Sequence, residues 1–464
     1  MNRLHVALLT GAFVLTACGG GAGGSVPSFQ PDATLPKTGT IPISHVVLMI
    51  QENRSYNDFF ATFPGGDGTM RGNMGKRTVR LKEVNLAWPC DLGHSRSAFL
   101  KDYDGGKMDG FYLEGGGKAP CPPQAGRTAY QYVNPQQIAP YWSIASQYVL
   151  ADHTYQTQGS GSFTAHQDLI RGGTTFDQSL DDALVDFPTA FPWGCDAGKG
   201  TTTSQLVWTG SGIKGPMKGP FPCSNKFPKS GQYYQTLRDL LDAQKVTWRY
   251  YTPALCCGGA LWNAFDMIAP VRYGPEWTTN IVTPPTQLFS DITNGTLASV
   301  SWVIPDGTNS DHPSHALKDD GPSWVASVVN AIGESKYWDS TAIVIVWDDW
   351  GGFYDKAKPP QPFDHWGGLG FRVPMLIVSP YAREAVPSKP GYISHTQYEF
   401  GSILRFIEDV WSLGRLGTTD TRAKSIIDSF DFSQSPRTFQ PIKSPLSRDY
   451  FEHEPPSNEP VDSE

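Results

Sequence analysis

Apolar residues in this chain gather in short runs that polar or glycine-rich segments separate. The run from Val46 to Ile50 is uninterrupted and rich in β-branched residues, so it predicts a buried strand over residues 41–50. Runs of the same kind predict further strands over residues 246–251, 298–304, 341–347 and 374–378. Because these runs are continuous rather than alternating, we expect both faces of the strands to be covered, as in parallel sheets.

Helical spacing of apolar residues occurs between these strands. The pattern predicts helices over residues 140–150, 162–171, 232–244, 322–332 and 398–410. Strands that alternate with helices indicate crossover connections, so the predicted fold class is α/β, with a mostly parallel central sheet sandwiched by helices. Residues 65–118 predict mostly loops, and residues 176–231, rich in Gly, Pro and Trp, predict an insertion that forms a cap or rim.

The first residues have the pattern of a targeting segment. Residues 1–17 contain a short positive start and the apolar run from Val6 to Val14, which is too short to span a bilayer. Leu15-Thr16-Ala17 precedes Cys18, and this tetrapeptide resembles a bacterial lipoprotein signal in which Cys18 is lipidated. An ordinary secretory signal with a chance cysteine is the alternative. We therefore expect an exported protein, lipid-anchored in the bacterial cell envelope, with a flexible tether over residues 18–40.

The length and the net charge of the chain limit its domain organisation and its partners. Residues 41–432 suffice for one large α/β domain, and the Pro-rich, acidic tail over residues 433–464 is expected to be mostly disordered. The net charge is −8, and Lys and Arg are scattered along the 464 residues without a basic stripe. No nucleic-acid partner is therefore expected.

Six cysteines remain after Cys18, an even number that favours disulfides in an exported chain. They are Cys90, Cys121, Cys195, Cys223, Cys256 and Cys257. Their spacing lacks paired C-x-x-C ligands, which argues against a zinc site built from cysteines. The sequence does not fix the pairing, and the adjacent Cys256 and Cys257 form either a vicinal disulfide or two separate bonds.

Polar residues directly follow two of the predicted strands. Glu52 and Asn53 come after the first strand, and Asp348 and Asp349 come after the strand over residues 341–347. Adjacent carboxylates repel each other unless a cation lies near them, and hard divalent cations favour carboxylate and amide oxygens. Because the carboxyl ends of parallel strands meet at one sheet edge, these residues predict one site for a divalent metal ion. A solvated acidic turn is the ordinary alternative.

Ser162 opens a predicted helix after the segment Gln158-Gly-Ser-Gly161. Taken alone, it is best explained as a helix N-cap. A hydroxyl at a helix N-terminus also faces donors that favour an anion, and beside a metal it is a competent nucleophile for phosphoryl transfer. His94 and His312 lie in loops as further candidates. Histidines with less support are His153, His166, His315, His365 and His395.

Several motifs together resemble the bacterial phosphoesterase family that contains phospholipases C and acid phosphatases, within the alkaline phosphatase superfamily. The most specific motifs are Gln51-Glu-Asn-Arg-Ser-Tyr56, Asp348-Asp349 with Gly351-Gly352-Phe353, and Arg372-Val-Pro with Ser379-Pro-Tyr-Ala-Arg383. The resemblance implies that the four strand-end residues hold the metal and that Ser162 is the nucleophile. It also implies that His94 and His312 contact the transferring phosphoryl group or protonate the leaving oxygen.

The sequence departs from this family pattern at two places. Relatives show Gly-Pro-Ser/Thr and then Pro-Asn, whereas Gly161 and Ser162 here precede Phe163, so Ser160 or Thr164 is an alternative nucleophile. Lys356 follows Asp355 where many relatives have His, which leaves the choice of substrate open.

The resemblance implies a metal-dependent hydrolase of phosphate esters that forms a covalent phosphoserine. The Asp348-Asp349 pair favours an acid phosphatase. The expected lipid anchor and the tryptophans Trp193, Trp208 and Trp262 support the alternative, a phospholipase C that cleaves phospholipid head groups. A non-catalytic surface lipoprotein on the same fold is a further alternative. The chain lacks the Cys-x-Pro-x-Arg segment of a sulfatase-like enzyme.

Overall fold

The computed structural model describes residues 41–116, 121–175, 182–223, 234–256, 259–360, 368–386 and 391–457. The chain divides after Thr40, and every element named below belongs to the unit that begins at Ile41. The predicted signal, Cys18 and the predicted tether lie outside the described residues, as do Cys257 and His365.

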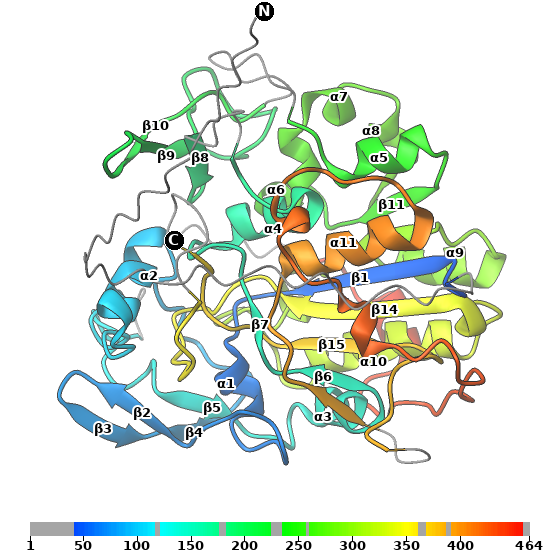
Figure 1. The fold of residues 1–464 in the computed structure, drawn as a ribbon, viewed down its shortest axis with the longest axis horizontal. Helices are drawn as coiled ribbons and strands as arrows, with labels where there is room; N and C mark the ends of the chain where they lie inside the picture. Colours follow the sequence, from blue (N-terminus) through cyan, green and yellow to red (C-terminus); the bar gives the residue numbers. More distant parts are fainter. Residues whose placement is uncertain are drawn as a thin grey trace, which may run out of the picture. The chain divides into compact units, whose positions relative to one another are not determined.

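An eight-stranded sheet forms the centre of this unit (Figure 1). From edge to edge its strands are β12 (Ile281–Val282), β11 (Trp248–Tyr251), β13 (Val300–Val303), β1 (His45–Gln51), β14 (Thr341–Trp347), β15 (Met375–Val378), β6 (Val149–Ala151) and β16 (Tyr392–Ser394). β15 runs antiparallel to both of its neighbours, and the other neighbouring strands pair in parallel. The predicted α/β class with a mostly parallel central sheet is confirmed.

Continuous apolar strands build the middle of the sheet. All seven residues of β14 are buried, and so are the six from Val46 to Gln51 in β1. Successive side chains of a strand point to opposite faces, so both faces need a cover. Trp302 of β13 reaches one cover, where its Nε1 donates to the carbonyl oxygen of Leu169 at 3.1 Å. Trp347 of β14 reaches the other, where its ring packs edge-on against Tyr141 with centroids 4.9 Å apart.

Helices supply both covers (Figure 1). One group contains α4 (Ser162–Arg171), α5 (Leu237–Ala243), α6 (Gly259–Trp262) and α11 (Phe400–Trp411). The other contains α3 (Ala139–Gln147), α9 (Gln287–Asn294), α10 (Asp320–Gly333) and α12 (Arg448–His453). Shorter helices are α1 (Tyr56–Phe60), α7 (Ala269–Arg272) and α8 (Glu276–Thr279). α3 ends before the predicted residue 150 because residues 149–151 form β6.

The region of expected loops up to residue 116 holds more regular structure than predicted. β2 (Arg71–Met74) and β3 (Arg77–Arg80) form a hairpin, β4 (Lys82–Val84) pairs with β5 (Gln131–Val133), and α2 (Arg96–Tyr103) follows. The hairpin residues are mostly exposed and polar, so no apolar run marks them. Gly75 makes the tight turn between them at φ 55°.

The insertion contains a small sheet of its own. Its antiparallel strands are β8 (Asp182–Val185), β9 (Ser204–Trp208) and β10 (Ile213–Lys218). A second small sheet pairs β7 (Thr154–Tyr155) with β17 (Tyr398–Glu399). Disulfides join Cys195 to Cys223 in the insertion and Cys90 to Cys121, which confirms the expected use of these four cysteines. Cys256 is also disulfide-bonded.

The tail differs from the mostly disordered segment that its composition predicts. Residues 433–457 lie along the domain and include α12. The Phe451 ring packs against Trp324 of α10 with centroids 5.5 Å apart, and the Phe439 ring packs against Trp338 at 5.0 Å. Two aromatic anchors thus hold a segment whose average composition is polar.

Candidate active site

The polar residues after β1 and β14 meet at one edge of the sheet. These strands are parallel neighbours in a register that pairs Gln51 with Trp347, so the residues that follow them emerge side by side. The backbone N–H of Asn53 donates to Asp348 Oδ1 at 3.0 Å. Glu52, Asn53, Asp348 and Asp349 are all fully buried. The structure therefore brings together all four predicted metal-site residues.

Backbone conformation fixes this arrangement. Asn53 has a φ of 58°, a left-handed conformation that asparagine tolerates better than most residues. Gly351, at φ 60°, lies so close that an added Cβ would be 2.1 Å from the carbonyl oxygen of Asn53. Only glycine permits this approach.

Ser162 lies at the first position of α4 and points into the same group. Its Oγ is 3.2 Å from Asp349 Oδ2, to which it donates, and 3.2 Å from Asn53 Oδ1. The two alternative nucleophiles are engaged elsewhere. Thr164 Oγ1 donates to the carbonyl oxygen of Gly161, and Ser160 Oγ accepts from the backbone N–H of Asp186 at 2.9 Å. Because Asp186 follows β8, the insertion borders the loop that leads into α4.

His166, one of the histidines with less support in the sequence, completes the group. Its Nε2 lies 2.9 Å from Glu52 Oε1 and 4.0 Å from Asp348 Oδ2. Glu52, His166 and Asp348 each offer a buried ligand atom within 4.8 Å of the others. His166 follows Ser162 by four residues, so both side chains lie on one face of α4. That spacing was a usable signal in the sequence.

The electrostatics of the group favour a bound cation. Burial first, and then the neighbouring Asp348, raises the pKa of Glu52 well above its ordinary value, and the same two causes raise the pKa of Asp349. Burial lowers the pKa of His166 to about 4, so its imidazole is neutral at physiological pH and fit to bind a metal. Clustered carboxylates and a neutral imidazole form a donor set for a divalent ion.

One unsatisfied oxygen fits the same conclusion. The Asn53 amide is satisfied when its nitrogen faces Asp348 Oδ1 at 3.0 Å and Glu52 Oε2 at 3.2 Å. Asp348 Oδ2 is buried without a hydrogen-bond partner among the described residues. A divalent cation beside Asp348 Oδ2 would give this oxygen a partner, so the residues present fit a metal ion.

The two predicted histidines flank the other side of Asn53. His94 Nδ1 contacts the carbonyl oxygen of Leu92 at 2.7 Å, and His312 Nδ1 contacts that of Pro313. Each ring thus directs its Nε2 towards the Asn53 amide, 3.2 Å away for His94 and 2.9 Å for His312. His94 Nε2 is also 3.8 Å from Asp349 Oδ2. Both histidines therefore border Asn53, whose amide also contacts the Ser162 hydroxyl.

Other candidates lie outside this group. The His315 ring stacks on that of His312 with centroids 4.7 Å apart. His153 and His395 belong to a separate cluster at another place on the sheet edge. Lys356, at the second departure from the family pattern, pairs with Asp67 of that cluster.

Comparison with known proteins agrees with this geometry. The model of the phosphoesterase family matches residues 43–414. Phospholipase C A of Mycobacterium tuberculosis is 25% identical over 462 residues, covering 87% of this chain and 80% of that relative. Non-hemolytic phospholipase C of Pseudomonas aeruginosa is 22% identical, covering 79% of this chain and 53% of that relative. The chain belongs to the phosphoesterase family and is a phosphoric ester hydrolase.

Solved structures resemble the chain more distantly. An alkaline phosphatase superfamily protein from Vibrio parahaemolyticus is 10% identical with a TM-score of 0.37, covering 84% of this chain and 72% of that chain. The lipoteichoic acid synthase LtaP from Listeria monocytogenes is 7% identical with a TM-score of 0.36, covering 83% and 76%. These scores are too low to extend any property of those proteins to this chain.

Proposed function

We propose that this chain hydrolyses phosphate esters in a metal-dependent reaction through a covalent phosphoserine on Ser162, as an acid phosphatase-like enzyme. The observation that carries the proposal is the position of Ser162. Its Oγ lies at the N-terminus of α4, 3.2 Å from Asp349 Oδ2 and beside the group formed by Glu52, Asp348 and His166.

The metal-binding residues of this proposal are Glu52, Asp348 and His166, with Asn53 and Asp349 adjacent to them. A divalent ion held there would lower the pKa of the serine hydroxyl and neutralise charge on the phosphate oxygens. The roles of Asn53 and Asp349 as direct ligands stay predictions.

The chain's own residues supply the remaining chemistry. Asp349 accepts the hydrogen bond of the Ser162 hydroxyl and receives its proton as Oγ attacks phosphorus. The first N–H groups of α4 face the phosphate, where a helix N-terminus favours negative charge. As the ester bond breaks, His94 or His312 gives a proton to the leaving oxygen, a contribution of roughly 10²–10⁴-fold. Water then cleaves the phosphoserine and releases inorganic phosphate.

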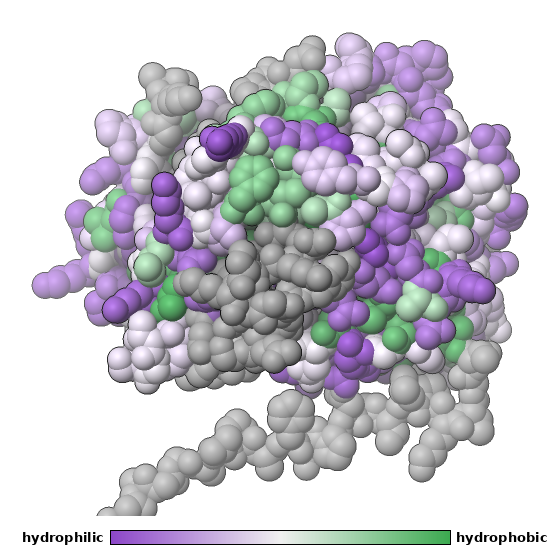
Figure 2. Space-filling model, turned by 90° about the horizontal axis from the view of Figure 1, so that it is seen from above, coloured by the Kyte–Doolittle hydropathy of each residue, from purple (hydrophilic) through white to green (hydrophobic). Residues whose placement is uncertain are grey.

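The substrate is proposed as a phosphomonoester on the strength of the Asp348-Asp349 pair. The names of the curated relatives support a second candidate, a phospholipase C that releases a phosphorylated head group. On the face in Figure 2, hydrophobic residues form small groups among hydrophilic ones. No helix within the described residues is long and apolar enough to cross a bilayer.

A substrate panel on the purified protein tests the function. We expect release of inorganic phosphate from a soluble aryl phosphate, and loss of that release with a chelator. Release of phosphocholine from phosphatidylcholine without phosphatase activity would select the phospholipase. If the metal-loaded protein hydrolyses neither compound, the result would favour the alternative of a non-catalytic surface lipoprotein.

We also propose export and lipid anchoring through Cys18, which rest on the Leu15-Thr16-Ala17-Cys18 segment. Radiolabelled palmitate should label the wild-type protein in bacterial cells and not the Cys18→Ala variant. Equal labelling of both would contradict the anchor.

A further inference from the structure

A second cluster of metal-ligand side chains lies on the same sheet edge as the candidate active site. Asp152 and His153 follow β6, and His395 follows β16. β6 and β16 are parallel neighbours with Ala151 paired to Ser394, so their carboxyl ends place these three residues together. β15 separates β6 from β14, which puts this cluster about 10 Å from the Asp348 site along the edge.

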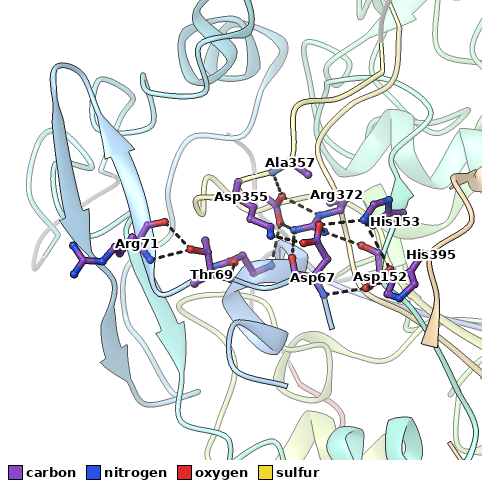
Figure 3. Close-up of polar contacts among 11 residues, drawn as sticks. Asp67, Thr69, Arg71, Asp152, His153, Asp355, Ala357, Arg372 and His395 are labelled. Atoms are coloured by element: carbon purple, nitrogen blue, oxygen red, sulfur yellow. Dashed lines mark hydrogen bonds and ion pairs between the residues drawn. The ribbon is translucent and has the colours of Figure 1, made fainter. Parts of the chain in front are cut away.

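The side chains of this cluster converge on one carboxylate (Figure 3). His395 Nδ1 lies 2.9 Å from both carboxylate oxygens of Asp152. His153 Nε2 lies 4.0 Å from Asp152 Oδ1 and 3.1 Å from Asp67 Oδ2. One ligand atom from each of Asp152, His153 and His395 lies within 4.8 Å of the other two.

Arg372 lies beside Asp152, and its Nη1 donates to the backbone carbonyl oxygen of Asp152 at 2.9 Å. The guanidinium of Arg372 forms two hydrogen bonds with the Asp355 carboxylate, at 3.0 and 3.1 Å. It also forms an ion pair with the Asp67 carboxylate at 3.1 Å (Figure 3). Lys356 pairs with Asp67. Among the described residues, no Lys or Arg side chain forms an ion pair with Asp152, whose carboxylate is fully buried. The carboxylate accepts a hydrogen bond from the backbone N–H of Asp67 at 2.9 Å, and a buried carboxylate is stabilised further by a positive partner.

A second buried polar atom lies near the same carboxylate. The Tyr56 side chain is fully buried, and its hydroxyl has no hydrogen-bond partner among the described residues. Burial first, and then the charge of Asp152, raises the pKa of Tyr56.

We propose that Asp152, His153 and His395 bind a transition-metal ion of the zinc class, separate from the catalytic ion. Two imidazoles and one carboxylate suit zinc better than magnesium or calcium, which prefer oxygen ligands alone. His395, with 61% of its side chain exposed, and His153, with 32%, leave the ion in contact with solvent. Three protein ligands and water make the four-coordinate set that zinc adopts.

The ion would join the edge strand to the body of the sheet. β16 has three residues and pairs with β6 alone in the central sheet. An ion that ligates residues after both strands binds the folded chain and not the unfolded one, so it raises the unfolding temperature by mass action. The proposed role is therefore stabilisation of this edge.

Metal stoichiometry and cobalt spectra test the proposal on the purified protein. The design compares the wild type, the double variant His153→Gln/His395→Gln, and Asp348→Asn, which weakens the catalytic site instead. His453→Gln, an exposed histidine of α12 outside the cluster, is the matched control. We expect the double variant to bind one fewer zinc ion and to keep its phosphatase activity, while Asp348→Asn retains the ion of the second cluster.

Substitution of cobalt separates the two sites by spectroscopy. In the Asp348→Asn background, the visible bands of cobalt with histidine ligands should disappear with the added His153→Gln/His395→Gln changes, and zinc affinity there should fall at least about 10-fold. An unchanged zinc stoichiometry in the double variant would overturn the proposal. So would cobalt bands in the Asp348→Asn background that survive the loss of both histidines.

Discussion

Asn53 is the residue through which the parts of the active site meet. Its backbone N–H holds Asp348, one atom of its amide faces Ser162 and the carboxylates, and the other faces the two histidines. An asparagine is suited to this place because one planar group presents an acceptor on one side and a donor on the other. The left-handed backbone at Asn53 aims that group.

Replacement of Ser162 tests the nucleophile. Ser162→Ala removes the oxygen that forms the phosphoserine, so kcat should fall by at least about 10³-fold. Ser160→Ala is the matched control, since the Ser160 hydroxyl bonds to Asp186 instead, and it should keep turnover within a few-fold. Steady-state kinetics with an aryl phosphate measure both. Activity retained by Ser162→Ala and lost by Ser160→Ala would reverse the assignment.

Replacement of His166 tests the ligand that the sequence analysis did not single out. His166→Ala should lower metal affinity at least about 10-fold and reduce activity with it, because the imidazole lies between Glu52 and Asp348. Metal analysis of the dialysed protein provides the measurement. His315→Ala is a matched control on a neighbouring histidine, and it should retain the metal. Full metal content in His166→Ala would show that His166 is not a ligand.

The meeting of the ends of β1 and β14 was predictable from the sequence. The face of α4 that carries Ser162 and His166 was not recognised. Glu52 and Asp348 were placed together because continuous apolar runs predict parallel strands, whose ends share an edge. His166 follows Ser162 by four residues, a spacing that puts both side chains on one face of a helix. A single buried histidine is common in a protein core, however, so this spacing alone does not identify a ligand. Only the packing of α4 against the sheet brings His166 to Glu52.

At the scale of elements, helices and strands with long apolar patterns were predicted well, and short polar elements were not. β14 has its predicted bounds, and α4 begins and ends where its pattern does. The hairpin of β2 and β3 and the helix α12 bury few residues, so their own sequences lack a strong period. Contacts with distant residues stabilise them, and a local pattern does not report such contacts.

The tail helix is expected to contribute to stability. Phe451 is buried against Trp324, and Phe451→Ala should lower the free energy of unfolding by about 3 kcal/mol through lost burial and a cavity. Denaturant unfolding followed by tryptophan fluorescence measures this. Tyr450→Ala, at a more exposed neighbour, is the control and should cost less. Equal unfolding midpoints for wild type and Phe451→Ala would mean that the tail does not pack on the domain.

α11 carries a carboxyl group that makes stability depend on pH. Burial first, and then Asp420, raises the pKa of Glu408 to about 8 from an ordinary value of 4.5. The unfolded chain loses this proton near pH 4.5 and the folded chain near pH 8, so this group makes the protein less stable as pH rises through that window. Above pH 8 the destabilisation is complete.

Glu408→Gln should remove this dependence, because glutamine keeps an acceptor for the Leu416 N–H and does not ionise. Urea midpoints at several pH values measure the effect. Relative to the wild type, the variant should gain stability steadily between pH 4.5 and pH 8. A constant difference across that range would contradict the shifted pKa.

At the scale of the whole molecule, one sheet edge holds both proposed metal sites, and two disulfides cross-link segments outside the central sheet. The Cys195–Cys223 bond closes a loop with a sequence separation of 28 residues. Replacement of both cysteines by serine should lower the free energy of unfolding by about 3–4 kcal/mol, chiefly because the unfolded chain gains conformational entropy. Thermal unfolding with and without reductant measures this. A variant as stable as the oxidised wild type would contradict it.

The fate of the phosphoryl group is the most direct test of the central claim. The metal-loaded enzyme is mixed with an excess of aryl phosphate, quenched in acid within milliseconds, digested and mapped by mass spectrometry. The mechanism predicts a phosphopeptide with the phosphate on Ser162, which disappears when a chelator is added before the substrate. Rapid turnover with no phosphorylated residue, or with phosphate on Ser160 or Thr164, would contradict it.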